Sequence, residues 1–495
     1  MTKLMRCKCT CVVIFFATMA VAAQGQVFTT ILGFNGSDGA VPQAGLVQGK
    51  DGNLYGTTTE GGASNNCNYG CGTVFQITAD GSRIRLHSFC SQSGCPDGYD
   101  PSAGVIQDTD GNFYGTTGFG GASSTNCPAG CGTIFRITSK GALTTIHTFD
   151  WTDGYLPLGL VQSVDGDFYG ITIYGGSTAC NNDAFAGCGT VFKITRHGTF
   201  TSLHNFDLGD GAYPYSALIQ ATDGNFYGQT TTGGHSGTLC QSTGCGTVFR
   251  MAGAGTLTTL HYFVGSDGSE PLGALLQASD GSFYGTTAGG GANFFGTVFR
   301  MGRNGSFSTV HNFDEDDGAS PNTGLIQATD GNFYGTTFQG GSAGHGTIFQ
   351  INSEGALTTL HNFCSDGCED GFQPELAPLV QDTSGVLYGT VDGGGKSNRR
   401  CITDSCGTIF SLDMGLGPFV TFVQPFGKIG QTGGILGQGF IGTTTVAING
   451  IPANFTILSD TYLTAKVPPG ATTGYVTVTT PTGVLTSNVP FHVIP

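Results

Sequence analysis

The strongest constraint on the fold of this chain is a phrase that recurs seven times. The copies follow the pattern D-G-N-F-Y-G-T-T, with their tyrosines about 55 residues apart on average. These tyrosines are Tyr55, Tyr114, Tyr169, Tyr227, Tyr284, Tyr334 and Tyr388. Such a period is typical of a repeat architecture, in which each unit forms one supersecondary structure.

Each unit contains four short runs with the composition of β-strands. Examples are GLIQ at Gly324, NFYGTT at Asn332, GTIFQI at Gly346 and ALTTLHNF at Ala356. Turns rich in Gly and Asp bound these runs, and no helical periodicity competes with them. Four strands per unit predict the blade of a β-propeller, because the rungs of a parallel β-helix are much shorter than one unit.

The two ends of the repeat array predict how it closes. The seventh unit stops after its third run, CGTIFSL at 406–412, and VFTTILGF at 27–34 matches the fourth run of the other units. Pairing these ends would remove two open sheet edges. We therefore expect an all-β fold with a seven-bladed propeller that is closed by its N-terminal strand.

Composition divides the chain into four parts. Lys3, Arg6 and Lys8 precede an apolar run that ends near Ala23, which predicts a signal peptide over residues 1–23. We expect the propeller over 24–413 and a linker over 414–418. Residues 419–495 contain short strand-like runs that suit a small immunoglobulin-like β-sandwich. No other stretch approaches the ~18 apolar residues that a membrane span needs, so we expect a secreted or cell-surface protein without a membrane span.

The charge balance argues against one class of partner. The chain has 18 Lys and Arg against 34 Asp and Glu, a formal net charge of -16. An acidic chain repels phosphate backbones and anionic lipid surfaces. We therefore expect no nucleic-acid partner.

Variation in length predicts which face carries function. The spacing from Gln48 to Tyr55 recurs unchanged in every copy. Two connections vary in length, the one between the second and third runs and the one between the fourth run and the next unit. Because the strands of a blade run up and down, the variable connections emerge on the face opposite the fixed turns. Loops on a rigid scaffold usually carry function.

All cysteines after residue 23 lie in these variable loops as local pairs. The two units with the shortest loops lack both members of a pair, so the cysteines are gained or lost together. In an exported protein this pattern favours disulfides, whereas zinc would need four converging ligands. The predicted disulfides are Cys67–Cys71, Cys90–Cys95, Cys127–Cys131, Cys180–Cys188, Cys240–Cys245, Cys364–Cys368 and Cys401–Cys406.

Aromatic side chains in the variable loops are the candidate ligand contacts. Their flat apolar faces suit a polar, ring-shaped ligand such as a glycan, although they could instead pack the loops themselves. These candidates are Tyr69, Tyr99, Trp151, Tyr155, Tyr213, Tyr215 and Phe295. We expect no catalytic residue, because nothing in the sequence marks a pair of carboxylates for glycoside hydrolysis.

A D-G-x-x-P motif precedes the first strand of every unit. Turn chemistry explains this motif, since Asp bonds nearby backbone and Pro sets the entry to the strand. The alternative is Ca²⁺, which takes oxygen ligands, and its candidate ligands are Asp314, Asp316, Asp317 and Asp370. Six histidines at one position of the fourth strand indicate a repeated structural role. No other cofactor is expected.

Two resemblances support this organisation. Through D-G-x-x-P, G-L-[VI]-Q, D-G-N-[FL]-Y-G-T-T and C-G-T-[VI]-F, residues 27–413 resemble the GloVer tandem repeat of bacterial exported proteins. That family is named for its varied C-terminal anchors and has no established activity. The phrases GQGF at Gly437 and VPPGATTGYVTV at Val467, with the closing FHVI, resemble the IPT/TIG immunoglobulin-like family. This second resemblance implies interaction rather than chemistry.

These patterns predict a secreted or cell-surface, non-catalytic binding or adhesion protein. Its ligand would be an extracellular glycan or protein, recognised through the disulfide-stapled loop face. One alternative is an extracellular lyase or glycoside-processing enzyme with its site at the mouth of the propeller channel. Another is a structural component of the cell surface.

Overall fold

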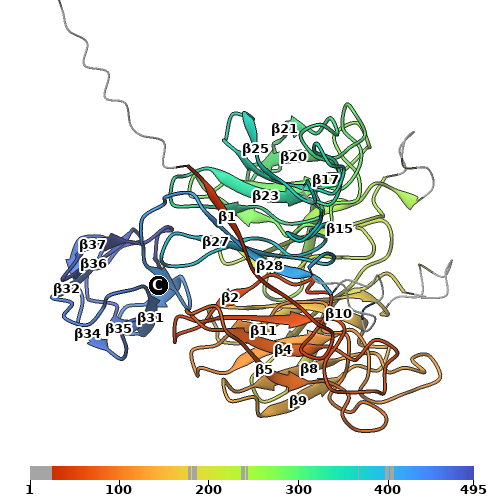
Figure 1. Cartoon of the computed structure of the whole chain (residues 1–495), viewed down its shortest axis with the longest axis horizontal. Coiled ribbons are helices and arrows are strands. Elements are labelled where there is room, and N and C mark those ends of the chain that lie inside the picture. Colours follow the sequence, from red (N-terminus) through yellow and green to blue (C-terminus); the bar gives the residue numbers. More distant parts are fainter. Residues whose placement is uncertain are drawn as a thin grey trace, which may run out of the picture.

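The structure is a computed structural model that describes residues 25–176, 180, 187–235, 240, 243–365, 367–395, 401 and 406–494. Throughout these residues every regular element is a β-strand, which confirms the all-β prediction (Figure 1). The predicted signal peptide, residues 1–23, lies outside the described residues. Within the described ranges, no helix is long and apolar enough to cross a membrane.

The described residues from Val27 to Asp413 form seven four-stranded antiparallel sheets, one for each repeat unit, as in propeller-like repeats. Sheet 1 contains β2 (Val47–Gln48), β3 (Leu54–Thr58), β4 (Thr73–Ile77) and β5 (Arg83–Ser88). Sheet 2 contains β6 (Ile106–Gln107), β7 (Phe113–Thr117), β8 (Thr133–Ile137) and β9 (Leu143–Thr148). Sheet 3 contains β10 (Tyr155–Gln162), β11 (Phe168–Tyr174), β12 (Thr190–Ile194) and β13 (Phe200–Asn205).

The remaining sheets of this region repeat the same order. Sheet 4 contains β14 (Ile219–Gln220), β15 (Phe226–Thr230), β16 (Thr247–Met251) and β17 (Leu257–Tyr262). Sheet 5 contains β18 (Leu276–Gln277), β19 (Phe283–Thr287), β20 (Thr297–Met301) and β21 (Phe307–Asn312). Sheet 6 contains β22 (Ile326–Gln327), β23 (Phe333–Thr337), β24 (Thr347–Ile351) and β25 (Leu357–Asn362). Sheet 7 contains β26 (Val380–Gln381), β27 (Leu387–Val391), β28 (Thr408–Asp413) and β1 (Val27–Gly33).

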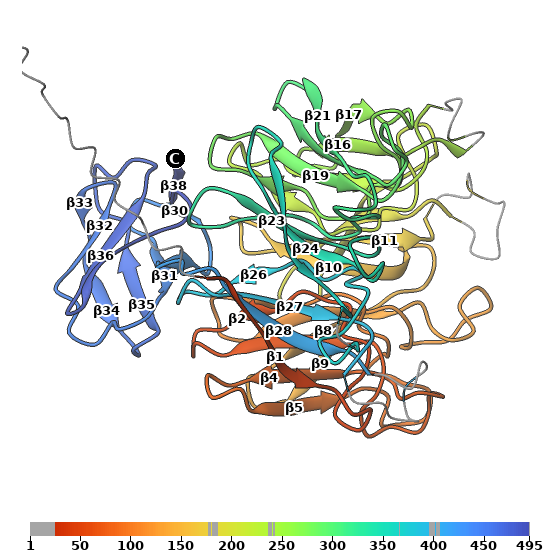
Figure 2. The ribbon, with the colours of Figure 1, turned by 45° about the horizontal axis from the view of Figure 1, so that its top comes forward.

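The N-terminal strand completes sheet 7, as the ends of the repeat array predict. β1 pairs antiparallel with β28, from Val27 opposite Asp413 to Gly33 opposite Thr408 (Figure 2). The first and last strands of the array are therefore hydrogen-bonded to each other. This pairing leaves neither terminal edge open.

The Tyr-Gly pair of the second strand has a packing cause. The Tyr227 ring stacks on Phe283 of the next sheet, with 4.1 Å between ring centroids. The following glycine lies against a phenylalanine of its own sheet, because a Cβ atom at Gly285 would approach Phe299 Cζ to 2.4 Å. Rings of this size bury large apolar areas, so the repeated phrase builds the core between sheets.

A glutamine at the end of the first strand joins neighbouring sheets. Gln327 Oε1 accepts a hydrogen bond from the Ser279 N–H of the preceding sheet at 2.8 Å, and its Nε2 donates to Gly331 O in its own turn at 3.0 Å. The same two bonds recur at Gln48, Gln107, Gln220, Gln277 and Gln381. Gln48 accepts from Thr383 N–H, so one of these bonds joins sheet 7 to sheet 1. The fixed length of this hairpin follows from the two bonds.

The repeated histidine and the aspartate of D-G-x-x-P contact each other. His261 Nε2 lies 2.9 Å from Asp267 Oδ2, while Asp267 Oδ1 accepts a hydrogen bond from Val264 N–H at 2.9 Å. Equivalent pairs are His87–Asp97, His147–Asp153, His204–Asp210, His311–Asp317 and His361–Asp370. The histidines and these aspartates therefore fasten the fourth strand to the turn that follows it.

The C-terminal module consists of two four-stranded sheets and one parallel pair. Its strands are β29 (Thr421–Phe422), β30 (Phe426–Lys428), β31 (Thr432–Leu436), β32 (Thr445–Ile448), β33 (Ile451–Pro452), β34 (Phe455–Ile457), β35 (Tyr462–Lys466), β36 (Val476–Thr480), β37 (Gly483–Thr486) and β38 (His492–Ile494). The sheets are β29-β31-β35-β34 and β33-β32-β36-β37, and β30 pairs with β38. Their shared core includes Phe440, Val446, Leu463 and Val478.

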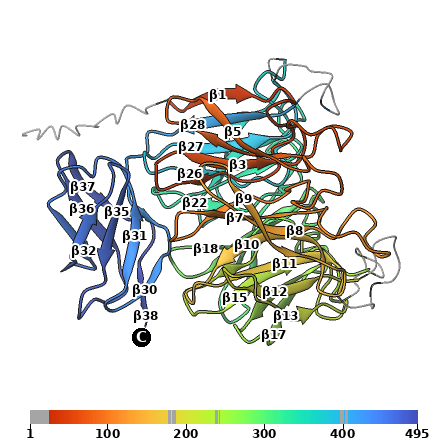
Figure 3. The same ribbon diagram turned by 90° about the horizontal axis from the view of Figure 1, so that it is seen from below.

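This module packs on the fixed turns of the repeat region. Thr461 Oγ1 donates a hydrogen bond to Lys50 O at 2.9 Å, and Phe419 N–H donates to Thr383 O at 3.1 Å. Lys50 and Thr383 lie in hairpins between first and second strands. In Figure 3 the module (blue) lies on the side of the sheets away from the long connections of sheets 1 to 3. The loop face is therefore left uncovered by the module.

Candidate functional site

A pocket of about 530 Å³ lies on the loop face between sheets 7, 1 and 2. Its lining combines aromatic rings with carboxyl groups. The rings are Tyr69, Tyr99 and Phe372, and the carboxyl groups are those of Glu60, Asp100, Glu375 and Asp392. We call this space the mouth pocket.

The residue before the motif proline is held toward the mouth by its backbone. Asp100 has a φ of 58°, in the left-handed region that non-glycine residues rarely adopt. Its N–H donates to Cys71 O at 3.1 Å, and its carbonyl accepts from Gly118 N–H at 2.8 Å. The same position has a positive φ in every unit, at Val41, Asp100, Leu156, Tyr213, Glu270, Ser320 and Gln373. Strained backbone of this kind persists where surrounding bonds fix it, and it is common at functional sites.

Two of the carboxyl groups are bridged by one amide. Gln43 Nε2 donates to Glu375 Oε2 at 2.7 Å and to Asp392 Oδ2 at 2.9 Å. Burial raises the pKa of Asp392 well above its usual value, and its hydrogen bond to Glu375 raises it further. Asp392 Oδ1 is buried and has no hydrogen-bond partner in the described part of the chain. These shifts favour a protonated Asp392 beside Glu375.

The other two carboxyl groups also hold their protons more tightly than usual. Burial, followed by the charge of Asp100, raises the pKa of Glu60 to about 7. Burial raises the pKa of Asp100 to about 6, against the opposing effect of the hydrogen bond that Ser102 Oγ donates to it at 2.8 Å. Near neutral pH the pocket therefore contains both carboxylic acids, which donate hydrogen bonds, and carboxylates, which only accept them.

A row of packed aromatic rings from sheets 2 to 4 begins at Tyr99 of the mouth pocket. Tyr99 stacks on Phe119 with 5.3 Å between ring centroids, and Phe119 contacts Tyr155 edge-on at 5.9 Å. Tyr174 then links Tyr155, at 6.0 Å, to Tyr213, at 5.2 Å. We call this row the aromatic arc.

The charges of nearby acids and tyrosines add to the effect of burial on two tyrosines, Tyr215 of the channel and Tyr155 of the aromatic arc. Burial raises the pKa of Tyr215, and the charges of Tyr174, Glu375 and Asp100 raise it further. Burial likewise raises the pKa of Tyr155 to about 12, with contributions from Tyr99, Tyr174 and Asp100.

The predicted aromatic contacts separate into four groups. Tyr69 and Tyr99 line the mouth pocket, and Tyr215 lines the cavity beneath it. Tyr155 and Tyr213 lie in the aromatic arc, and Trp151 packs on Tyr155 with 5.6 Å between ring centroids. Phe295 lies apart, against the core between sheets 5 and 6. The first two groups are thus candidate ligand contacts, while the others pack the loops.

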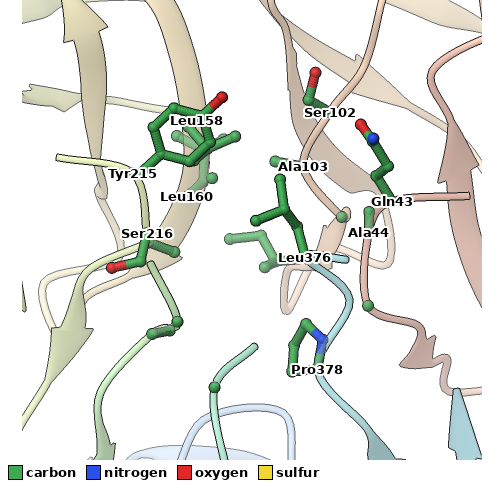
Figure 4. A pocket seen from close by; sticks show the side chains of 18 of the residues that line it. Gln43, Ala44, Ser102, Ala103, Leu158, Leu160, Tyr215, Ser216, Leu376 and Pro378 are labelled. Atoms are coloured by element: carbon green, nitrogen blue, oxygen red, sulfur yellow. The ribbon is translucent and has the colours of Figure 1, made fainter. Parts of the chain in front are cut away.

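A cavity of about 320 Å³, which we call the channel, runs between the first strands of all seven sheets. Leu158, Leu160 and Leu376 contribute apolar walls (Figure 4). The polar ends of Tyr215, Ser102 and Gln43 gather at one end of the view, and Pro378 lies at the other. Gln43 lines both the channel and the mouth pocket, so the two spaces adjoin.

The cysteines are joined in the seven pairs expected from their spacing. These pairs are Cys67–Cys71, Cys90–Cys95, Cys127–Cys131, Cys180–Cys188, Cys240–Cys245, Cys364–Cys368 and Cys401–Cys406. The disulfides also support the site. The backbone carbonyl of Cys71, the second cysteine of its pair, accepts a hydrogen bond from the N–H of Asp100, which precedes the motif proline of the next unit.

The calcium candidates are used by the turns. Asp317 and Asp370 bond His311 and His361, and Asp314 Oδ1 accepts the N–H of Asp317 at 3.2 Å. Asp316 is exposed on the same turn. Among the described residues, the one cluster with ligand atoms close enough for a metal is Cys67, Cys71 and Cys90, whose sulfurs are in disulfides. These positions therefore give no support to a calcium site.

Sequence reasoning missed Gln43 and the four carboxyl groups of the mouth pocket. Each of these residues differs from the residues at the same position in the other six units. Gln43, Asp100 and Glu375 lie next to the proline of the D-G-x-x-P motif, and Glu60 and Asp392 lie just after the second strand. All five belong to units 7, 1 and 2, which are neighbours once the array closes. The cluster could have been found by marking the positions at which a unit carries an acidic residue and most other units do not, and then arranging the units in a ring.

Comparisons with known proteins agree with the repeat assignment. The model of the Gloeobacter/Verrucomicrobia repeat matches residues 13–240 and 236–451, and no curated protein sequence matches the chain. Among solved structures, the extracellular domain of a hybrid two-component system from B. thetaiotaomicron is 13% identical with a TM-score of 0.48, over 94% of this chain and 57% of that one. This chain therefore spans less than two thirds of that domain.

Two further similar structures are described as 6-phosphogluconolactonases. The protein from Bacteroides uniformis is 15% identical with a TM-score of 0.42, over 65% of this chain and 84% of that one. The protein from Bacteroides fragilis is 17% identical with a TM-score of 0.39, over 64% and 82%. The family match spans most of the sequence, and the chain belongs to the Gloeobacter/Verrucomicrobia repeat family.

Proposed function

We propose that this protein acts outside the cell as a non-catalytic binding protein that recognises a glycan at the mouth pocket. In this proposal residues 1–23 are a signal peptide and residues 24–413 form a seven-bladed propeller closed by its N-terminal strand. Residues 414–418 are a linker, and residues 419–495 are an IPT/TIG immunoglobulin-like domain. The seven disulfides support an extracellular location, because such bonds persist mainly in oxidising compartments.

The observation that carries the proposal is the meeting of tyrosine rings and carboxyl groups in one concave space. The Tyr69 side chain is 45% exposed at the edge of the pocket, so a ring face is available to a ligand. Sugars present apolar ring faces and many hydroxyl groups. Aromatic rings can stack on the former, and the mixture of acids and carboxylates can exchange hydrogen bonds with the latter.

The size of the site favours a small ligand, such as a short saccharide, over a protein surface. A pocket of about 530 Å³ falls within the range of roughly 300–1,000 Å³ that is usual for small-molecule sites. Its acidic lining disfavours glycans that carry carboxylate or sulfate groups, because like charges repel. We therefore expect neutral saccharides.

A glycan array with the intact protein and two single variants tests this proposal. Tyr69→Ala removes an exposed ring of the pocket, and Phe294→Ala removes a 65% exposed ring in the loop of sheet 5. We expect Tyr69→Ala to weaken retention about tenfold, the loss of one stacking contact, and Phe294→Ala to leave it unchanged. Equal retention by both variants, or the absence of any glycan ligand, would contradict the proposal.

A second candidate function is acid–base catalysis on a glycan, as a hydrolase or lyase. It is favoured by one observation, the Glu375–Asp392 pair that Gln43 bridges. A carboxylic acid kept protonated by burial can give its proton to a leaving oxygen, and a neighbouring carboxylate can accept one from water or carbon.

Product release separates the two functions. Soluble fragments formed from a retained polysaccharide by the intact protein, and lost in Asp392→Asn while retention persists, would place catalysis ahead of binding. Asparagine keeps an acceptor for Gln43 but has no proton to transfer. Retention without fragments at any pH between 4 and 8 would leave the binding function in place.

A further inference from the structure

The channel adjoins a second space, whose lining combines apolar residues with glutamines of the first strands. This lower chamber has a volume of about 440 Å³ and shares Val47 and Ile106 with the channel. On the other side it is lined by the C-terminal module, through Phe422, Leu436 and Val489. The module therefore places apolar side chains across the end of the channel that is opposite the loop face.

One position that lines the channel carries a small residue or a proline in every unit. Three positions before the glutamine of the first strand, the copies carry Gly45, Gly104, Gly159, Ala217, Ala274, Gly324 and Pro378, and all seven line the channel. Short side chains let the neighbouring segments approach, since a Cβ atom at Gly104 would lie 2.8 Å from Gly45 O. The longer side chains that line the channel are mostly apolar, such as Leu160 and Leu376, with Gln43 and Tyr215 as the polar exceptions.

Polarity decreases from the mouth pocket into the channel. The mouth pocket carries carboxyl groups and phenols, Gln43, Ser102 and Tyr215 stand at the boundary, and leucines follow (Figure 4). Water gains little from a space with few polar partners, whereas apolar groups bind in such cavities. A water molecule occupies about 30 Å³ in the liquid and a methylene group is of similar size, so the channel has room for roughly ten such groups.

We propose that the channel binds one aliphatic chain of an amphiphile, whose uncharged polar head remains in the mouth pocket. The acidic mouth disfavours fatty-acid carboxylates and phospholipid phosphates, which leaves polyol heads such as those of glycolipids. The choice of head rests on the proposed glycan function, while binding of the chain depends only on the channel.

Calorimetric titration of the intact protein with glucose and with butyl, hexyl and octyl β-glucoside, each below its critical micelle concentration, tests the inference. Burial of one methylene group should tighten Kd about fourfold, so each two-carbon step should tighten it by roughly 16-fold until the channel is full. A Kd that is the same for all four ligands would overturn the inference.

Two substitutions at one lining residue assign the effect to the channel. Leu376→Trp fills the passage and should abolish the gain from chain length, whereas Leu376→Ala widens it and should preserve a gain. Near-ultraviolet circular dichroism and the midpoint of thermal unfolding establish that both variants fold. An undiminished gain in a folded Leu376→Trp variant would overturn the inference, because the chain would then bind elsewhere.

Titration of the same protein with soluble oligosaccharides, beside the alkyl glucosides, keeps this inference distinct from the proposed function. A chain-length gain with no binding of soluble oligosaccharides would contradict glycan recognition and support the channel site. Oligosaccharide binding with no gain would support glycan recognition and overturn the channel site.

Discussion

Replacing Asp100 with asparagine tests whether the mouth carboxyl groups destabilise the fold in which they are held. Burial raises the pKa of Asp100 from an ordinary 3.8 to about 6. The folded protein therefore binds this proton more tightly than the unfolded chain does, and ionisation of Asp100 destabilises the folded state. Asparagine keeps an oxygen that can accept the hydrogen bond from Ser102 Oγ, but it carries no charge.

The size and the pH range of the effect follow from this shift. A difference of about two pKa units corresponds to about 3 kcal/mol, and water near the pocket reduces this to about 1–3 kcal/mol. Below pH 4 both states are protonated and the cost is absent. It grows as the pH rises from about 4 to 6 and is constant above that. An asparagine at this position also suits the positive φ better than aspartate does, which adds an offset that does not vary with pH.

Urea unfolding at pH 4, 5, 6 and 8 measures the effect. We expect the free energy of unfolding of Asp100→Asn to exceed that of the parent by about 1–3 kcal/mol at pH 8 and by much less at pH 4. Asp316→Asn, at an exposed position, is the matched control and should show no such trend. An advantage of Asp100→Asn that is equal at all four pH values, or a loss at pH 8, would refute the reasoning.

Three other predictions concern the scaffold. Gly285→Ala should lower the free energy of unfolding by about 1–3 kcal/mol, because its Cβ atom would lie 2.4 Å from Phe299 Cζ. Urea titration measures this loss. The prediction would be contradicted if Gly285→Ala cost as much in a protein that already carries Phe299→Leu as it does in the parent. His261→Ala should lower the free energy of unfolding by about 1–3 kcal/mol, because Asp267 loses its hydrogen-bond partner. A decrease below about 0.5 kcal/mol in the same urea titration would argue against a structural role for the histidine. Reduction of the disulfides should increase protease cleavage in the loops but change the melting curve in far-ultraviolet circular dichroism little. The reason is that each bond closes a short loop and contributes no more than about 3 kcal/mol. Loss of the β-strand signal on reduction would show that the disulfides hold the sheets themselves.

The sheets could be predicted from the sequence because each of their positions occurs in several copies. A glycine that follows tyrosine in all seven units must have a common cause, and in the structure that cause is a phenylalanine ring against its Cα atom. The turn and strand roles of the repeated aspartates and histidines follow from the same reasoning. Their direct contact, such as that of His261 with Asp267, could not be foreseen, because the strand and the turn are separate runs in the sequence.

The candidate site could not be predicted from the repeat because its residues differ from those at the same positions in the other units. Glu60, Asp100, Glu375 and Asp392 each occupy a position where most other units carry an uncharged residue, so the repeat pattern hides them. Their proximity depends on closure of the array, which brings residues more than 300 positions apart to one pocket. Conversely, Trp151, Tyr155 and Tyr213 look available in the sequence, but they pack on other aromatic rings.

The mouth can vary while the scaffold stays constant because its residues are positioned through backbone groups. Asp100 is fixed by bonds from its own N–H and to its own carbonyl, and Tyr213 in sheet 4 makes the same two bonds, with Cys188 O and Thr231 N–H. Any side chain that tolerates a positive φ at this position is therefore presented to the mouth in the same direction. The seven copies indeed carry seven different residues there, from Val41 to Gln373. A substitution at this position can change which ligand is recognised without disturbing the contacts between sheets, so members of the family with the same repeats need not share a ligand.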